Sequence, residues 1–441
     1  MKLYRLLFIV FVFLIVEGIG FSQSPFATET VDLGTVTPGG RELTVIAIPD
    51  FNPAKSSSLL KEGVLSEIVY RDLELSGYFL KPKNLQIVKE NNLRDKKAGK
   101  VDFMEWRRLG ASFLLLGDYF INESSLWTEV HLFDVGTGKK IFGKKFENFK
   151  PNQFRILGHK ISDEIIHYIT GINGVANTKI AFVSNRAGHK EVWIMDADGY
   201  NQHSITNDKS ITAVPCWGKN ATEIYYTSYK EYNPDLCGVF LDGSKSWFIT
   251  KFSGLNFAPS WSEKTQRLAV TLGKDGNSEI YTMDRNGKSS KRLTYNKSID
   301  SSPCWSPEGN EIVFTSDRSG EPQLFIMNSE GFNVRRVTLQ GRYNDAGVWS
   351  PKGDKIAFQG RSSGFFNIFL MNVDGTDWVQ LTYNQGNNED PSWSPDGQHL
   401  VFSSDRNGKP QIFVMHIDGS GQTQLTFKEI SHSSAWSPYL D

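Results

Sequence analysis

The sequence predicts an α/β N-terminal domain followed by an all-β six-bladed β-propeller that is closed by the C-terminal strand. Two observations predict this fold. The second half of the chain repeats a 44-residue pattern, and each repeat divides into four short strands with their turns. The first half lacks the repeat and mixes strand-like with helix-like hydrophobic spacing. The composition agrees, because 39% hydrophobic and 22% charged residues are typical of a folded chain.

The chain starts with the pattern of a secretory signal peptide. Lys2 and Arg5 precede an unbroken apolar run, Leu6–Val16, and small residues follow at Gly18–Ser22. We expect residues 1–22 to be the signal peptide, with cleavage near residue 22. An apolar run of this length is shorter than the roughly 20 residues that span a bilayer. The mature protein is therefore expected to be exported and soluble, without an integral membrane segment.

Residues 23–172 are expected to form the mixed α/β domain. Apolar residues at helical spacing predict a helix that ends near Gly77, and Ser56–Ser58 can cap its start before Leu60. A second helix is predicted from Pro151 onward, because that segment has one apolar face. Gly136–Gly138 predicts a hairpin turn. The remaining predicted elements are the strands Leu43–Ile48, Tyr78–Leu80 and Phe113–Leu116, the short helix Phe103–Leu109, and the hairpin strands Trp127–Phe133 and Lys140–Phe146.

Residues 173–441 are expected to form the propeller. Tryptophan occurs at 217, 261, 305, 349, 393 and 436, at steps of 44 residues except for a last step of 43. Each unit reads as four strands separated by Gly-, Pro- and Asp-containing turns, which is typical of a propeller blade. The alternative is an open β-solenoid. The tryptophans are interpreted as core between blades rather than as a carbohydrate platform.

The two ends of the repeat favour a closed ring. The first unit begins at Lys179–Val183, which corresponds to a second strand, and no tryptophan precedes it. The missing first strand lies at the end of the chain, in Ser433–Pro438. We therefore expect the C-terminal strand to complete the first blade and to leave no open edge.

Most catalytic and cofactor motifs are missing. Lys and Arg number 48 against 49 Asp and Glu, which argues against nucleic-acid binding. The run Gly138–Lys144 has the glycines of a phosphate loop, but Lys145 stands where that loop needs Ser or Thr. The three cysteines exclude a disulfide framework. Asp196–Gly199 is interpreted as a hairpin turn rather than a calcium loop. We expect no catalytic residues, no cofactor and no metal site.

The segments before each tryptophan differ from blade to blade, whereas the framework repeats. Loops that vary on a rigid scaffold commonly carry binding, so we expect a binding surface at this mouth of the channel. Its acidic residues also leave a channel cation open as an alternative, and the Asp317–Arg318 type of turn is expected on the opposite rim. The candidate residues are Thr212, Asn256, Phe257, Asp300, Ser301, Asn344, Asp345, Glu389, Asp390 and His432.

The whole chain resembles the TolB family of the Tol-Pal system. The resemblance rests on the order of signal peptide, α/β domain and six blades with Trp-Ser-Pro turns, and on the blocks Glu42–Phe51, Leu65–Phe79, Gly110–Tyr119 and Phe133–Gly138. It implies a non-enzymatic periplasmic adaptor that supports outer-membrane integrity and constriction at cell division. It further implies that the propeller mouth binds the lipoprotein Pal, that the mature N-terminus binds TolA, and that other outer-membrane proteins are further partners.

The resemblance carries over unevenly to individual residues. Leu255–Pro259 and Gly341–Ala346 match family segments that border the Pal surface, which adds Leu255 and Arg342 to the candidates. Gln23–Gly40 agrees with the TolA-binding segment in position but poorly in sequence; its candidate residues are Thr28, Glu29, Thr30, Val31 and Asp32. Two alternatives remain: an exported propeller that binds a carbohydrate or small ligand, and an accessory domain of an exported hydrolase.

Overall fold

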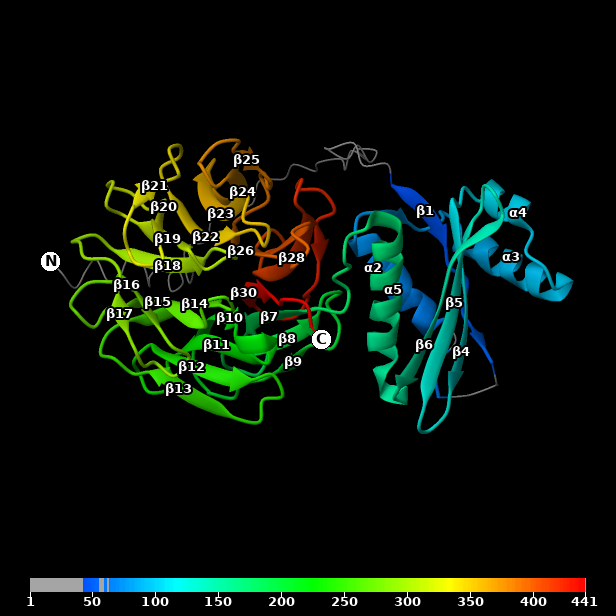
Figure 1. Cartoon of the computed structure of the whole chain (residues 1–441), viewed down its shortest axis with the longest axis horizontal. Coiled ribbons are helices and arrows are strands. Elements are labelled where there is room, and N and C mark those ends of the chain that lie inside the picture. Colours follow the sequence, from blue (N-terminus) through cyan, green and yellow to red (C-terminus); the bar gives the residue numbers. More distant parts are fainter. Residues whose placement is uncertain (1–42, 55–58, 62, 441) are drawn as a thin grey trace, which may run out of the picture. The chain divides into compact units, whose positions relative to one another are not determined.

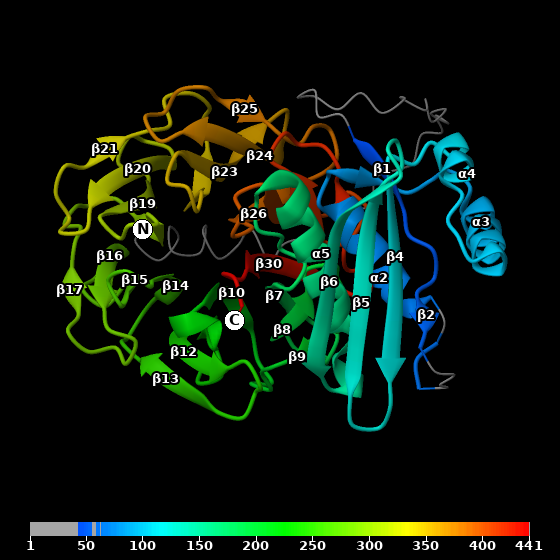
Figure 2. The ribbon, with the colours of Figure 1, turned by 45° about the vertical axis from the view of Figure 1, so that its right-hand side comes forward.

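The fold was analysed in a computed structural model that describes residues 43–54, 59–61 and 63–440 (Figures 1 and 2). The predicted signal peptide, the candidate TolA-binding residues Thr28–Asp32 and the helix cap at Ser56–Ser58 lie outside the described residues. Among the helices of the described part, none is long and apolar enough to cross a membrane.

The N-terminal region is built on one mixed sheet. Its strands follow the order β3-β1-β4-β5-β6, and β2 pairs with β4 beside this path. β1 runs parallel to β3 and β4, whereas β4, β5 and β6 form an antiparallel meander. The predicted hairpin is thus confirmed, and the run that resembles a phosphate loop lies mostly within β6 instead of before a helix. The strands are β1 (Thr44–Ala47), β2 (Asn52–Pro53), β3 (Phe79–Leu80), β4 (Phe113–Ile121), β5 (Leu126–Asp134) and β6 (Lys139–Phe149).

Helices cover both faces of this sheet (Figure 2). Leu115 of β4 packs in the core that contains α2 and α5, while Leu114 packs with Trp106 of α4 on the other face. Gly158 lets α5 approach α2 closely, because a Cβ there would lie 2.7 Å from Ile68 Cγ2. The helices are α2 (Val64–Leu75), α3 (Leu85–Ala98), α4 (Phe103–Arg108) and α5 (Phe154–Thr170), the last preceded by a 3-10 turn at Pro151–Gln153.

The sequence reading missed α3 and began α2 too early. In α3 only Val88 and Asn91 are buried, so the helix lacks the apolar stripe that a pattern search detects. Its N-cap is Asn84, whose side chain accepts hydrogen bonds from the backbone of residues 86 and 87.

The remaining chain forms six four-stranded antiparallel sheets, the blades of a propeller. Blade 1 contains β30 (Ser431–Trp436), β7 (Lys179–Ser184), β8 (Glu191–Asp196) and β9 (His203–Ser204); blade 2 contains β10 (Thr212–Trp217), β11 (Glu223–Ser228), β12 (Asp235–Phe240) and β13 (Ser246–Thr250), with a 3-10 turn at Lys219–Ala221; blade 3 contains β14 (Asn256–Ser262), β15 (Arg267–Leu272), β16 (Glu279–Met283) and β17 (Lys291–Arg292). Blade 4 contains β18 (Asp300–Trp305), β19 (Glu311–Ser316), β20 (Gln323–Asn328) and β21 (Arg335–Arg336); blade 5 contains β22 (Asn344–Trp349), β23 (Lys355–Ser362), β24 (Phe365–Asn372) and β25 (Val379–Gln380); blade 6 contains β26 (Asn388–Trp393), β27 (His399–Ser404), β28 (Gln411–His416) and β29 (Thr423–Gln424).

The ring is closed as the sequence predicts. β30, the C-terminal strand, pairs with β7, and Trp436 stands opposite Ile180. The first strand of each blade, here called the inner strand, contacts the inner strand of the next blade, and β10 contacts both β14 and β30. The closing contact replaces the open edges that a solenoid would have.

The repeated tryptophans pack between blades, which confirms their predicted role. Trp217 lies in one hydrophobic cluster with Ala181 and Ile194 of the preceding blade. Its Nε1 donates a hydrogen bond to the Ala435 carbonyl oxygen at 2.9 Å, so the indole also joins the two inner strands. Trp393 makes the equivalent bond to the preceding blade.

The strand directions correct one expectation about the two faces of the ring. Asp300 pairs with Ser316, and Asp317 Oδ1 accepts a hydrogen bond from the Ile299 backbone at 2.8 Å. The Asp317–Arg318 turn therefore lies on the same face as the mouth segments, not on the opposite rim. Because consecutive strands of a blade are antiparallel, the second strand returns the chain to the face from which the inner strand starts. The opposite face carries the Trp-Ser-Pro turns and the turn that contains Phe332.

Candidate functional site: the channel mouth

The first residue of each inner strand is buried. Four of the candidate residues, Thr212, Asn256, Asp300 and Asn344, occupy this position. Several of their polar groups bond to the preceding blade: Asn256 Oδ1 of blade 3, for instance, accepts from the Thr250 hydroxyl of blade 2 at 2.8 Å. These side chains therefore brace the mouth from inside rather than face a partner.

Arginines from the neighbouring turns hold several of these buried residues. Arg318 Nη2 lies 2.9 Å from Asp300 Oδ2, and Arg406 donates to Asn388 Oδ1 at 2.8 Å. Each guanidinium also covers aromatic rings of its own blade, as Arg318 does above Phe325 at 4.9 Å. The sequence predicts these Asp-Arg turns on the opposite rim and therefore does not assign the arginines to the mouth, although they recur two residues before a glycine in equivalent turns.

The second residue of each inner strand is followed by a bulge. Phe257, Ser301, Asp345 and Glu389 are half-buried at this position, and the register shifts directly after each of them. The following residue has a left-handed φ between 47° and 53° in all six blades, although it is never glycine. Such strained backbone persists only where surrounding contacts enforce it.

Side chains of the preceding blade hold these bulges in place. The Ser302 amide donates to Thr271 Oγ1 at 3.2 Å, and the Asp390 amide donates to Gln359 Oε1 at 2.9 Å. The Ser433 amide bonds to a serine hydroxyl in the same way. A movement of one inner strand would thus be transmitted to the next blade. The sequence reading missed these second-strand hydroxyl and amide groups, because their partners lie a whole repeat away.

The acids of the mouth hold protons more tightly than free carboxyl groups. Burial raises the pKa of Glu389 to about 8, and the neighbouring carboxylate of Asp390 adds to the rise. Burial likewise raises the pKa of Asp390 to about 6. Asp345 also has a raised pKa through burial, although the Thr315 hydroxyl bonds its carboxylate at 2.6 Å. The mouth is therefore less negative near neutral pH than its composition suggests.

The other candidate residues differ in their exposure to solvent. Leu255 and Phe257 are half-buried, and Arg342 is exposed. His432 is buried, its Nδ1 lies 2.9 Å from the Ser433 hydroxyl, and burial lowers its pKa to about 3. The side chains open to a partner on this face are thus mainly aliphatic, aromatic and basic.

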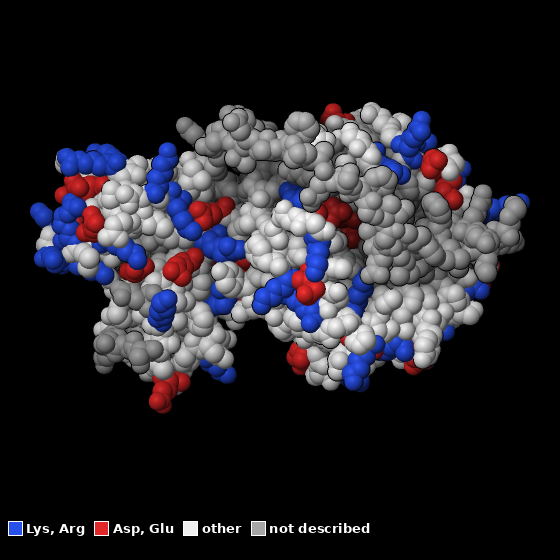
Figure 3. All heavy atoms as spheres, turned by 180° about the vertical axis from the view of Figure 1, so that it is seen from behind, with Lys and Arg blue, Asp and Glu red and all other residues white. Residues whose placement is uncertain are grey.

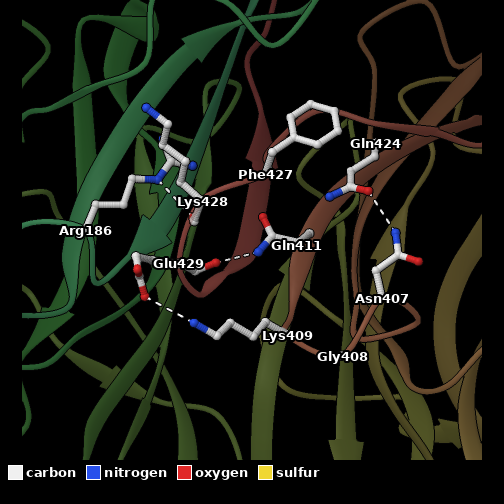
Figure 4. A pocket seen from close by; sticks show the side chains of 9 residues that line it. All are labelled: Arg186, Asn407, Gly408, Lys409, Gln411, Gln424, Phe427, Lys428 and Glu429. Carbon is white, nitrogen blue, oxygen red and sulfur yellow. Dashed lines mark hydrogen bonds and ion pairs between the residues drawn. The ribbon is translucent and has the colours of Figure 1, made fainter.

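A groove opens between blade 6 and blade 1 (Figure 4). Its volume is about 760 Å³, and it is lined by Arg186, Asn407, Gly408, Lys409, Gln411, Gln424, Phe427, Lys428 and Glu429. Part of its charge is satisfied internally, since Lys409 Nζ lies 3.4 Å from Glu429. Phe427 is 72% exposed, so it does not close over the groove.

A second charged cluster lies where the α/β region meets blade 1. Arg155 of α5 bonds Asp196, the last residue of β8, at 3.0 Å, and Asp198 of the following turn at 2.6 Å. His159 Nδ1 lies 2.8 Å from Asp72 of α2. Burial alone would lower the pKa of His159, but Asp72 and Asp196 outweigh it and raise the pKa to about 10. The predicted hairpin turn at Asp196–Gly199 thus also carries this ion-pair network.

The spacing of Asp72, His159 and Asp198 would suit a metal ion, because one ligand atom of each lies within 4.8 Å of the others. However, the Arg155 guanidinium bonds Asp198, and His159 bonds Asp72. Since cationic side chains already neutralise these carboxylates, the cluster is better described as ion pairs than as a metal site.

Comparison with protein families assigns both regions. A model described as the TolB beta propeller domain matches residues 166–368 and 346–440, and one described as the TolB amino-terminal domain matches residues 35–141. The chain belongs to the TolB family. The order of the two TolB regions along the chain is the order that the sequence analysis predicts.

Curated relatives carry the name Tol-Pal system protein TolB. Those from Syntrophotalea carbinolica and Geobacter metallireducens are 36% identical over 160 residues and 43% identical over 128 residues. These alignments cover 36% and 29% of this chain, and the chain spans 37% and 30% of the length of the two relatives. The relative from Rickettsia prowazekii is 31% identical over 216 residues, which cover 47% of this chain and 46% of that protein.

A solved structure supports the same family over nearly the whole chain. The crystal structure of TolB from Acinetobacter baumannii matches with a TM-score of 0.77 and 27% sequence identity. The match covers 90% of this chain and 97% of that chain.

Proposed function

We propose that this protein is a non-enzymatic adaptor of the Tol-Pal system in the periplasm. In this proposal its propeller mouth binds the lipoprotein Pal, and its mature N-terminal segment binds TolA. Through these contacts it supports outer-membrane integrity and constriction at cell division.

One observation carries the proposal: both TolB domain models match this chain, in the family's order. The relatives that share these domains are named for the Tol-Pal system. The structure supports the mouth as the binding face, because it is rigid in its frame and variable in its exposed side chains. Hydrogen bonds between blades hold the bulges in place. Beside the bulges, Phe257 and Leu255 are partly exposed to solvent and Arg342 is exposed.

Phe257 is the proposed anchor for Pal. Aromatic side chains that become fully buried in an interface dominate binding energy. Phe257 sits at the second position of β14, directly before the bulge in the pairing of β14 with β15. The half-buried acids contribute less, since burial raises the pKa of Glu389 to about 8.

The test compares two phenylalanines on opposite faces. Phe257→Ala should weaken binding to the isolated periplasmic domain of Pal by about 1–4 kcal/mol if Phe257 is a hot spot. Phe332→Ala is the matched control, since Phe332 is 68% exposed in the turn between β20 and β21 on the other face. Titration calorimetry measures both, with melting curves to confirm folding. Loss of binding in the Phe332 variant alone would contradict the proposal, because it would indicate that Pal binds the face opposite the mouth.

A small-ligand function would centre on the groove between blades 6 and 1. That groove has one aromatic side chain, Phe427, and its exposure argues against a stacking platform for sugars. The hydrolase alternative would need a further catalytic domain. The adaptor function therefore agrees better with the family and with the site.

A further inference from the structure

We propose that the segment Lys81–Arg108, here called the α3–α4 lobe, binds the surface of an anionic phospholipid bilayer. The lobe contains α3 and α4 and lies on the sheet face opposite α2 and α5. This inference goes beyond the proposed function and does not require that Pal or TolA binds.

The lobe has a strong positive charge. It contains nine Lys and Arg against four Asp and Glu, a net charge of +5 in a chain whose net charge is −1. Figure 3 shows basic side chains gathered at this end of the molecule, over α3 and α4. Clustered basic side chains attract anionic lipid surfaces.

The few acids of the lobe are already engaged. Glu105 pairs with Arg94 at 2.9 Å and also bonds Arg108. Asp95 accepts a hydrogen bond from Trp106 Nε1 at 2.8 Å. Within the described part of the chain, no ion pair or side-chain hydrogen bond involves the ammonium groups of Lys83, Lys89, Lys96, Lys97 and Lys100. These lysines are therefore available to an external anionic surface.

Large apolar side chains are exposed among these lysines. Leu85, Lys89, Leu93 and Lys97 follow one another at intervals of four residues and share one face of α3. Leu85 is 46% exposed and Leu93 56% exposed, and Met104 of α4 is 60% exposed. The core holds only Val88 and Asn91 of this helix. A helix that directs leucine and lysine outward together can insert its apolar side chains while its ammonium groups stay at the headgroups.

The kinds of residue favour lipid over protein as the partner. Protein interfaces are enriched in Tyr, Trp and Arg and depleted in Lys. The exposed apolar side chains of the lobe are aliphatic, and its free cations are lysines. Trp106, the single tryptophan of the lobe, is buried against the sheet.

The experiment uses the full mature chain and sedimentation with vesicles. One set of vesicles mixes phosphatidylcholine with phosphatidylglycerol, and the other is pure phosphatidylcholine. We expect binding to the anionic set alone, and we expect salt to weaken it. The double change Lys89→Gln, Lys97→Gln should lower the partition coefficient about thirty-fold at low salt, because each lysine contributes about 1 kcal/mol and a tenfold change corresponds to about 1.4 kcal/mol.

Two further variants separate the contributions. Leu93→Gln keeps the charge and should also reduce binding, because it removes an inserting side chain. Lys245→Gln, Lys288→Gln removes the same charge from exposed sites of the propeller and should leave binding unchanged. Gln replaces Lys in a helix at little cost, and melting curves check that each variant is folded.

Three results would overturn the inference. One is equal binding of the wild-type chain to both vesicle sets. Another is unchanged binding after Lys89→Gln, Lys97→Gln, and the third is an equal loss in the propeller control, which would indicate a general charge effect. If neither the wild-type chain nor any variant bound vesicles, and a lobe variant lost Pal binding, the α3–α4 lobe would be a protein interface instead.

Discussion

At the scale of single residues, the mouth depends on buried side chains that never reach solvent. Asp300 is fully buried, and its charge is balanced by Arg318 from the turn beside it. A buried carboxylate that loses its partner is costly, because neither water nor another cation replaces the lost interaction. The geometry of the mouth is thus set one layer beneath the side chains that could touch a partner.

The first prediction compares two arginines of blade 4. Arg318→Met should lower the free energy of unfolding by about 2–4 kcal/mol, because Asp300 is left buried without its cation. Arg335→Met is the control: Arg335 pairs with Glu311 at 2.8 Å, but its side chain is 45% exposed, so the change should cost less than about 1 kcal/mol. Urea unfolding measures both. Equal costs would contradict the role assigned to Arg318.

The second prediction concerns the proton on Glu389. Its pKa in the folded protein is raised to about 8, above the ordinary value, so the protonated form favours folding. This contribution is present below about pH 4.5 and is lost as pH rises through about 8. Glu389→Gln should therefore stabilise the protein by about 1–3 kcal/mol at pH 9 and by much less at pH 5. Melting curves across this range test it, and a pH-independent difference would contradict it.

At the scale of elements, the sequence predicts the pairing of the closing inner strand but does not predict the helix α3. β30 is separated by most of the propeller from β7, yet the two pair along their length. The sequence predicts this pairing because each blade repeats four strands and one strand is missing at the start. In contrast, α3 buries little, so its hydrophobic pattern does not identify it.

The third prediction concerns the closing strand. Deletion of residues 431–441 should destabilise the whole propeller, because β7 loses one of its two paired strands and β10 and β26 lose an inner neighbour. Calorimetry should show a melting temperature lower by at least several degrees. A truncated protein that melts within a degree or two of the full chain would contradict closure as the source of stability.

At the scale of the whole molecule, the charged cluster between α2, α5 and blade 1 links the two regions. Arg155 and His159 come from α5, and their partners Asp196 and Asp198 belong to the propeller. Since these groups are largely buried, the loss of one partner of an ion pair would leave its counterpart buried without a compensating charge.

The fourth prediction tests this link through His159. Its pKa in the folded protein is raised to about 10, so its charge stabilises folding fully below about pH 6.5, and this contribution is lost as pH rises through about 10. His159→Gln should cost about 2–4 kcal/mol at pH 6 and clearly less at pH 10. Unfolding curves at both values decide it; a cost that grows with pH would mean that the histidine is neutral.

The fifth prediction concerns the segment that lies outside the described residues. Removal of residues 23–40 should abolish binding to TolA and leave binding to Pal intact, if this segment is the TolA contact. This segment is rich in Thr, Gly and Pro and contains few large apolar residues. Pull-down with each partner measures the effect. Unchanged TolA binding would assign that contact to another surface.

The sequence by itself determined the architecture: the period of 44 residues, the tryptophan positions and the displaced last strand predict six blades and their closure. It did so because a repeat encodes each blade through short-range spacing. Only the tertiary structure decided that Asn256 and Asp300 are buried braces, that the Asp317–Arg318 turn shares the mouth face, and that Arg155 joins two regions. These features depend on contacts between residues far apart in the chain, and neither composition nor local spacing contains that information.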